Sequence, residues 1–288
     1  MWLPTAFENS PGLLGWAAAA ALLEAGAYLS MASERLRALW TPAHLVLFAP
    51  LPYLLYALPC GVFAPASMLA ILAASAIAAW WYALWPRQRW SDALYVALMA
   101  APLIFKVFPF IYDPPVPDVR LDFLGQLLWI RTGVVTLLRE RNPEGVHFGF
   151  WPDAREWRVG AVWYAALLPA VFALAWLTGF AQPAWPPWNW RETLLRAAAT
   201  FIGILWVVAL SEEFFFRGLL QRWIGIAGAS VLFGLAHLGF RQFPNWRFAI
   251  VAGVAGVFYG MACRRGGGIR AAMVTHALTV VTWRLFFR

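Results

Sequence analysis

The sequence predicts an all-α protein, a polytopic transmembrane bundle of about eight to ten helices. Two observations support this fold class. Of the 288 residues, 62% are hydrophobic and only 12% are charged, whereas soluble domains carry about 25% charged residues. The apolar residues also gather in runs close to the ~20 residues that a helix needs to cross a bilayer. We therefore expect an integral membrane protein whose main partner is the lipid bilayer.

The candidate spans alternate with polar or proline-rich loops. They cover residues 12–32, 42–62, 65–85, 92–111, 159–180, 193–215, 226–242, 246–263 and 271–287. A further stretch, 121–138, has Arg131 at its middle and is either a buried span or an interfacial helix. If it spans, the arginines of the loops fall mostly on one side of the membrane, which would be the cytoplasmic side.

The longest polar break, residues 139–158, divides the chain. We expect an N-terminal transmembrane helical region of unknown role over residues 1–150 and a second membrane domain over residues 151–288. Glu24 and Arg131 lie inside apolar runs of the first region, where they could pair across helices. A structural role is expected for such a pair, because an isolated charge within a membrane is costly.

The net charge of +8 does not indicate a nucleic-acid partner. The basic residues stand in ones and twos between apolar runs, as loop arginines of membrane proteins do, and form no basic stripe. The chain has two cysteines, Cys60 and Cys263, without a CxxC spacing. Neither a disulfide framework nor a thiolate metal site is therefore expected.

Three ionisable residues follow the apolar run FIGILWVVAL, in the stretch SEEFFFR at 211–217. Glu213 and Arg217 have the i, i+4 spacing that places two side chains on one helix face, so they can form an ion pair. Glu212 lies about 100° away around the helix and is left free to face a cavity as a general base. The alternative is a purely structural ion pair at a helix end.

Two histidines follow in the next apolar runs. His237 ends the motif FxxxH, with Phe233 one turn before it, and His276 lies in the last run. Between them, Gly256 and Gly260 form a GxxxG motif, which favours close helix contact. Each histidine alone could be a packing residue.

Together with Glu212, the two histidines could act on one water molecule. Glu212 and His237 could activate the water, while His276 stabilises an oxyanion. The same three side chains could instead bind a metal ion as two histidines and one carboxylate. The motifs HExxH and GxSxG are absent.

The motifs EExxxR, FxxxH and a final histidine resemble those of the CPBP superfamily, in order and in approximate spacing. This superfamily includes type II CAAX prenyl endopeptidases and bacteriocin-processing and self-immunity proteins. The resemblance covers roughly residues 200–284 and implies a CPBP-like, glutamic-type intramembrane protease domain at 151–288. It assigns water activation to Glu212 and His237, the oxyanion hole to His276, and a supporting role to Glu213, Arg217 and Phe233. No cofactor is then expected, although a metal stays open.

One position departs from the family pattern. The last motif is commonly HxxxN, and its asparagine supplies a second oxyanion donor, but position 280 is Val280. Loss of one such donor costs about 2.7–4 kcal/mol of transition-state stabilisation. Thr279, Asn245 and Trp283 are the candidate replacements.

The predicted function is hydrolysis of a peptide bond in a membrane-anchored or C-terminally hydrophobic or lipidated protein. The expected location is the bacterial plasma membrane. Three alternatives stay open: a metal-dependent protease using the same residues, a non-catalytic scaffold or immunity protein, and a transporter. The transporter is disfavoured because the two halves show no corresponding interrupted helices.

Overall fold

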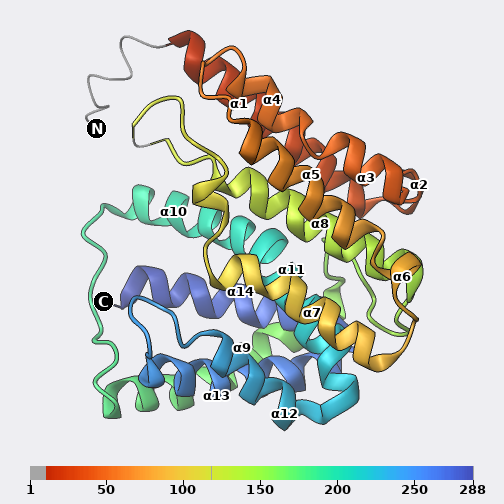
Figure 1. Ribbon diagram of the computed structural model, residues 1–288. Coiled ribbons are helices and arrows are strands. Elements are labelled where there is room, and N and C mark those ends of the chain that lie inside the picture. Colours follow the sequence, from red (N-terminus) through yellow and green to blue (C-terminus); the bar gives the residue numbers. More distant parts are fainter. Residues whose placement is uncertain (1–10, 118, 288) are drawn as a thin grey trace. The chain divides into compact units, whose positions relative to one another are not determined.

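The computed structural model describes residues 11–117 and 119–287, and the chain divides into two compact units between Asn142 and Pro143. Both units are helical (Figure 1). The described residues form no β-strand, and only an isolated bridge joins Pro183 to Phe287. The predicted all-α class is confirmed.

The sequence places the boundary at residue 150, whereas the two units divide a few residues earlier, after Asn142. The segment that follows Pro143 packs within the second unit. The N–H of Ile269 donates to the carbonyl of Val146 (3.0 Å), and the indole N–H of Trp206 donates to the carbonyl of Phe150 (3.1 Å). These contacts tie the polar loop to the second unit.

The first unit consists mainly of short helices. They are α1 (Pro11–Leu29), η2 (Ser30–Ala32), α2 (Glu34–Ala38), α3 (Pro42–Phe48), α4 (Leu51–Ala57), α5 (Pro65–Ala79), α6 (Trp81–Leu84), α7 (Arg89–Ile104), η3 (Phe108–Phe110) and α8 (Asp122–Glu140). The predicted span 42–62 is divided into α3 and α4, with Pro50 and Pro52 at the break. Proline removes a backbone donor and disfavours helix continuation through it.

Among the described residues, four helices are long and apolar enough to cross a membrane: Gly12–Ala32, Ala154–Leu177, Trp190–Ala236 and Trp246–Gly266. This is fewer than the predicted eight to ten, because 42–62, 65–85 and 92–111 form shorter helices and because 193–215 and 226–242 lie in one continuous segment. The long Trp190–Ala236 segment is itself interrupted at Gly225, whose φ of 72° is not helical. That break separates the two predicted spans 193–215 and 226–242.

Many large apolar side chains are exposed on the described helices. They include Leu22, Leu69, Val162, Trp176, Leu177 and Leu195. Extended apolar surface of this kind is unusual for a soluble monomer but suits contact with lipid. With the long apolar helices, it identifies an integral membrane protein.

A buried ion pair joins α1 to α8 in the first unit. The guanidinium of Arg131 donates to both carboxylate oxygens of Glu24 at 3.1 and 3.2 Å, and both side chains are fully buried. The guanidinium also lies 4.4 Å from the ring centroid of Trp40 and 5.0 Å from that of Phe48. The predicted pairing is confirmed, and α8 packs against α1, α5 and α7 as a buried helix.

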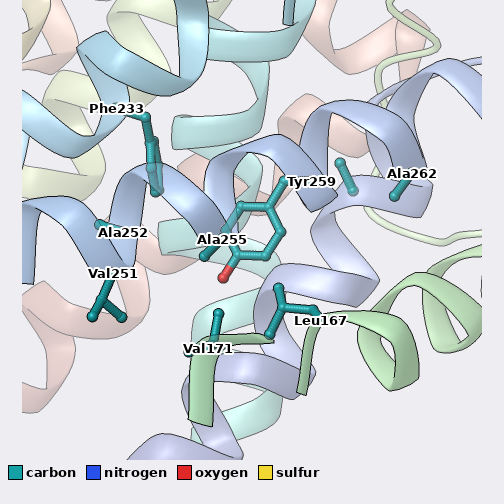
Figure 2. Close-up of a cluster of buried hydrophobic side chains, with 9 residues drawn as sticks. Leu167, Val171, Phe233, Val251, Ala252, Ala255, Tyr259 and Ala262 are labelled. Atoms are coloured by element: carbon teal, nitrogen blue, oxygen red, sulfur yellow. The ribbon is translucent and has the colours of Figure 1, made fainter. Parts of the chain in front are cut away.

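The second unit contains α9 (Ala154–Leu177), α10 (Trp190–Gly203), η4 (Ile204–Ala209), α11 (Leu210–Glu213), η5 (Phe214–Leu220), α12 (Gln221–Ala236), α13 (Trp246–Gly266) and α14 (Ile269–Phe286). Helix α13 contacts α9, α12 and α14. Its buried alanines, with Leu167, Val171 and Phe233, form a hydrophobic cluster around Tyr259. Figure 2 shows Tyr259 at the centre of this cluster, with Leu167 and Val171 facing it.

The start of α9 is fixed by a capping box. Asp153 accepts from the N–H of Glu156, and Glu156 accepts in return from the N–H of Asp153, both at 2.8 Å. The bond from the Glu156 N–H lowers the pKa of the Asp153 carboxyl. Glu156 also pairs with Arg270 at 3.0 Å, which links the first turn of α9 to that of α14.

We expect Arg131→Ala to destabilise the first unit strongly, because it leaves the Glu24 carboxylate buried without a partner. Removal of one member of a buried pair costs about 3–5 kcal/mol. Unfolding of the detergent-purified protein, followed by heat or denaturant, measures the loss. Glu34→Ala is the control. Glu34 is exposed, and its ion pair with Arg37 is long, at 3.6 Å, so the substitution should change the free energy of unfolding by no more than about 0.5 kcal/mol. Equal effects of the two substitutions would contradict the strong stabilisation that we expect from the buried pair.

Candidate active site

The two adjacent glutamates lie on one α-helical turn between two π-helical segments. α11 carries Glu212 and Glu213, while η4 precedes it and η5 follows. π-Helical turns are rare and occur frequently at functional sites, since the wider turn re-aims side chains. Here Ile204, Val208 and Glu212, spaced by four, line the same cavity.

Glu213 and Arg217 form the predicted ion pair. Arg217 Nε lies 3.2 Å from Glu213 Oε2, and both side chains are fully buried. The guanidinium also donates to the carbonyl of Gly256 at 3.1 Å and lies 4.4 Å from the ring centroid of Phe233. The arginine is thus compensated by a carboxylate, a carbonyl and an aromatic face, as a charge in an apolar interior requires.

His276 is held from two sides. Its Nδ1 lies 2.8 Å from Glu213 Oε1, and its ring stacks on Tyr259 with centroids 4.6 Å apart and planes 11° apart. A carboxylate paired with arginine only accepts hydrogen bonds, so Nδ1 of His276 carries the proton. The other ring nitrogen, Nε2, lies 3.9 Å from Glu212 Oε2.

His237 follows the last residue of α12. Its Nδ1 lies 2.7 Å from the carbonyl of Phe233, one turn earlier, and its ring packs 4.6 Å from the Phe233 ring. A carbonyl only accepts, so the proton sits on Nδ1 and Nε2 of the neutral ring is left as an acceptor. The FxxxH spacing therefore sets the tautomer of His237 through the backbone of Phe233.

One cavity of about 430 Å³ brings together Glu212, His237 and His276. Its walls are otherwise mostly apolar, and they come from α9, η4, α12, α13, α14 and the loop after α12. The lining also includes Val171, Phe233, Phe240, Arg241, Phe248, Val251, Ala252, Ala255, Tyr259, Thr279, Val280, Trp283, Arg284 and Phe287. Glu212 keeps 29% of its side chain exposed, whereas Glu213 has none. The carboxylate that faces the cavity is thus the one that is not paired with Arg217.

Of the three candidate replacements for the missing oxyanion donor, two line the cavity and one does not. Thr279 and Trp283 line the cavity with Val280, but the Thr279 hydroxyl donates to the carbonyl of Thr275 at 2.7 Å. Asn245 lies outside the lining. Its Oδ1 caps α13 by accepting from the N–H of Phe248 (3.1 Å), and its Nδ2 donates to the carbonyl of Phe240 (2.9 Å).

Three polar residues of the cavity were missed by sequence reasoning: Tyr259, Arg241 and Arg284. Tyr259 is a single polar aromatic residue in the middle of an apolar span, which is a weak signal. Arg241 and Arg284 follow His237 and His276 on the same segments. Within the described part of the chain, no three His, Cys, Asp or Glu side chains form a group that could hold a metal ion.

Glycines bring α12 and α13 close together beside the site. A Cβ added to Gly234 would lie 2.5 Å from the carbonyl oxygen of Ala249, and one added to Gly256 would lie 3.1 Å from Arg217 Nη2. The carbonyl of Gly260 accepts from Gln221 at 3.2 Å. The GxxxG motif therefore gives close helix contact, as expected, and also provides carbonyl acceptors for buried polar side chains.

Residues 193–282 match the family described as Type II CAAX prenyl endopeptidase Rce1-like. The match confirms the resemblance to this peptidase family for a segment that contains Glu212, His237 and His276. No curated protein matches the chain, and no solved structure does.

We expect Gly234→Ala to force α12 and α13 apart, because the new methyl group meets backbone that cannot turn away. Overpacking of this kind costs about 1–3 kcal/mol. The resulting shift should also displace His237, which lies about one turn after Gly234. Unfolding in detergent checks the stability loss. Gly203→Ala is the matched control, since a Cβ at Gly203 meets nothing within 4 Å. A destabilisation of the same size in both variants would contradict the close approach at Gly234.

Proposed function

We propose that this protein is a glutamic-type intramembrane endopeptidase. It hydrolyses a peptide bond in a membrane-anchored or C-terminally hydrophobic protein, in the plasma membrane of a bacterium. The observation that carries the proposal is the convergence of Glu212, His237 and His276 on one cavity. The match of the segment containing them to a peptidase family supports it.

Water activation falls to Glu212 and His237. Glu213 is occupied by Arg217 and His276, whereas Glu212 Oε2 has only His276 Nε2 near it, at 3.9 Å, which is beyond hydrogen-bond reach. Nε2 of His237 is an acceptor in the neutral ring. A water between these two groups loses a proton to one of them as its oxygen attacks the substrate carbonyl. The same proton then passes to the leaving amine, so the enzyme is regenerated.

His276 acts on the oxyanion. It can donate from Nε2 only as an imidazolium ion, and the Glu213 carboxylate at Nδ1 stabilises that form. Glu213 is therefore a positioning residue, and Arg217 holds Glu213 in turn. Tyr259 supports the arrangement by stacking on the imidazole ring.

Tyr259 is also our candidate for the second oxyanion donor, in place of an asparagine at 280. It lines the cavity with Val280 and stacks on His276. Thr279, on the α14 turn that carries Val280, lines the same cavity. A phenolic O–H is a suitable donor to a developing negative charge.

We expect Glu212→Gln and His237→Ala each to lower the cleavage rate at least about 100-fold, because a positioned general base contributes roughly 10²–10⁴. The assay is mass spectrometry of products from an N-acylated library of apolar decapeptides in detergent. Glu192→Gln, an exposed glutamate of α10, is the matched control and should cleave like wild type. Wild-type cleavage by either cavity variant, folded as judged by its unfolding curve, would overturn the mechanism.

We expect Tyr259→Phe to lower kcat by about 10²–10³ with little loss of stability, since only the hydroxyl is removed and the ring stacking stays. Val280→Asn in the Tyr259→Phe background should restore part of the rate by supplying an amide donor. Tyr164→Phe serves as control: its hydroxyl is 2.6 Å from Thr282 Oγ1, and Tyr164 does not line the cavity. An unchanged kcat in Tyr259→Phe would exclude the hydroxyl as donor.

One simple measurement distinguishes each of the two leading alternatives from the proposed mechanism. A metal-dependent protease should contain a stoichiometric metal after purification and lose activity with a chelator. A scaffold or immunity protein should tolerate Glu212→Gln in a complementation assay. The glutamic mechanism predicts the opposite result in each case.

A further inference from the structure

The first unit has an apolar groove beside its buried ion pair. The groove encloses about 590 Å³, which lies within the range of ligand sites, roughly 300–1,000 Å³. Its four leucines are exposed, so the acyl chains of a surrounding bilayer can reach it. The lining residues come from η2, from α2 and the turn after it, from α3 and from α4: Ser30, Leu36, Leu39, Trp40, His44, Leu47, Phe48 and Leu51.

The aromatic side of this groove is held in place from behind. Trp40 and Phe48 meet edge to face, with ring centroids 5.2 Å apart, and the guanidinium of buried Arg131 lies 4.4 and 5.0 Å from these two centroids. The indole N–H of Trp40 donates to the Ser30 hydroxyl at 2.7 Å, which donates in turn to the carbonyl of Ala27 at 2.6 Å. A wall that is already ordered costs little to order on binding, so the groove is prepared for a ligand.

Two polar side chains stand at the α2 end of the groove. Arg35 is exposed and has no acidic partner among the described residues, and its i, i+4 spacing from Leu39 places it on the same helix face as that lining residue. His44 lines the groove, and its Nδ1 lies 2.6 Å from the carbonyl of Leu39. Since a carbonyl only accepts, Nδ1 of His44 carries the proton and Nε2 of the neutral ring is left as an acceptor.

This end of the first unit is positively charged. Arg139, in the last turn of α8, shares a small pocket with Arg37 of α2, and Arg141 pairs with Asp92 in the first turn of α7 at 2.7 Å. Arginines outnumber carboxylates where these segments meet. The arginines are Arg35, Arg37, Arg87, Arg89, Arg139 and Arg141, and the carboxylates are Glu34, Asp92 and Glu140. Such an excess attracts anionic lipid headgroups.

We propose that this groove binds an anionic phospholipid, with an acyl chain against Trp40 and Phe48 and the phosphate at Arg35. A guanidinium forms strong, charge-assisted hydrogen bonds with phosphate oxygens. A headgroup hydroxyl, as in phosphatidylglycerol, can donate to Nε2 of His44. A zwitterionic phospholipid offers the same chains and phosphate, but its ammonium group is repelled by the surrounding arginines. The inference gives the first unit a role that does not depend on the proposed peptidase function.

The test is native mass spectrometry of the full-length protein in neutral detergent, titrated with dioleoyl phosphatidylglycerol or dioleoyl phosphatidylcholine. We expect wild-type protein to bind phosphatidylglycerol more tightly. Arg35→Gln should weaken that binding about fivefold, the contribution of one arginine near anionic lipid, and should leave phosphatidylcholine binding unchanged. Arg89→Gln is the matched control, because it removes the same charge from the same end of the unit but lies outside the groove lining. It should bind both lipids like wild type.

A second titration tests the groove itself. Glycerophosphoglycerol has the same headgroup without acyl chains, and we expect wild-type protein to bind it far more weakly than the intact lipid, because the apolar contacts are lost. Equal binding of the two would overturn the inference, as would equal binding of phosphatidylglycerol and phosphatidylcholine. The same loss in Arg35→Gln and Arg89→Gln would show diffuse attraction to the whole charged end and would also overturn it. If wild-type protein is a dimer in lipid nanodiscs and Leu47→Ala makes it monomeric, a second copy covers the groove and the inference is wrong.

Discussion

The buried ion pair between Glu213 and Arg217 is the interaction on which the rest of the second unit depends. Two opposite charges are buried together, and burial of this kind is costly unless polar or aromatic groups nearby compensate the charges. The partners come from other helices: the Gly256 carbonyl from α13, the Phe233 ring from α12 and the His276 imidazole from α14. The ion pair thus sets how these helices pack around it.

This requirement explains why neighbouring glutamates differ. Glu213 contacts Arg217 with one carboxylate oxygen and His276 with the other, while Glu212 faces the cavity. The contact with Glu213 also fixes the tautomer and orientation of His276. π-Helical segments flank the glutamates on both sides, which is a frequent feature of functional sites.

The first unit uses the same physical solution without an adjacent histidine. Glu24 and Arg131 are buried together, and the guanidinium lies against the rings of Trp40 and Phe48. A carboxylate with an aromatic face therefore compensates a buried arginine in both units. What distinguishes the second unit is the free carboxylate beside the pair and the cavity that it faces.

Much of this could be predicted from residue spacing. Membrane helices follow from long apolar runs, and the Glu213–Arg217 pair follows from i, i+4 geometry, because both depend on neighbours within one helix. Asn245 was a plausible oxyanion donor by type, yet its amide caps α13. Tyr259, Arg241 and Arg284 reach the cavity through packing between segments far apart in the chain. Periodicity within one helix does not predict contacts between helices, so only the folded arrangement of α12, α13 and α14 could reveal them.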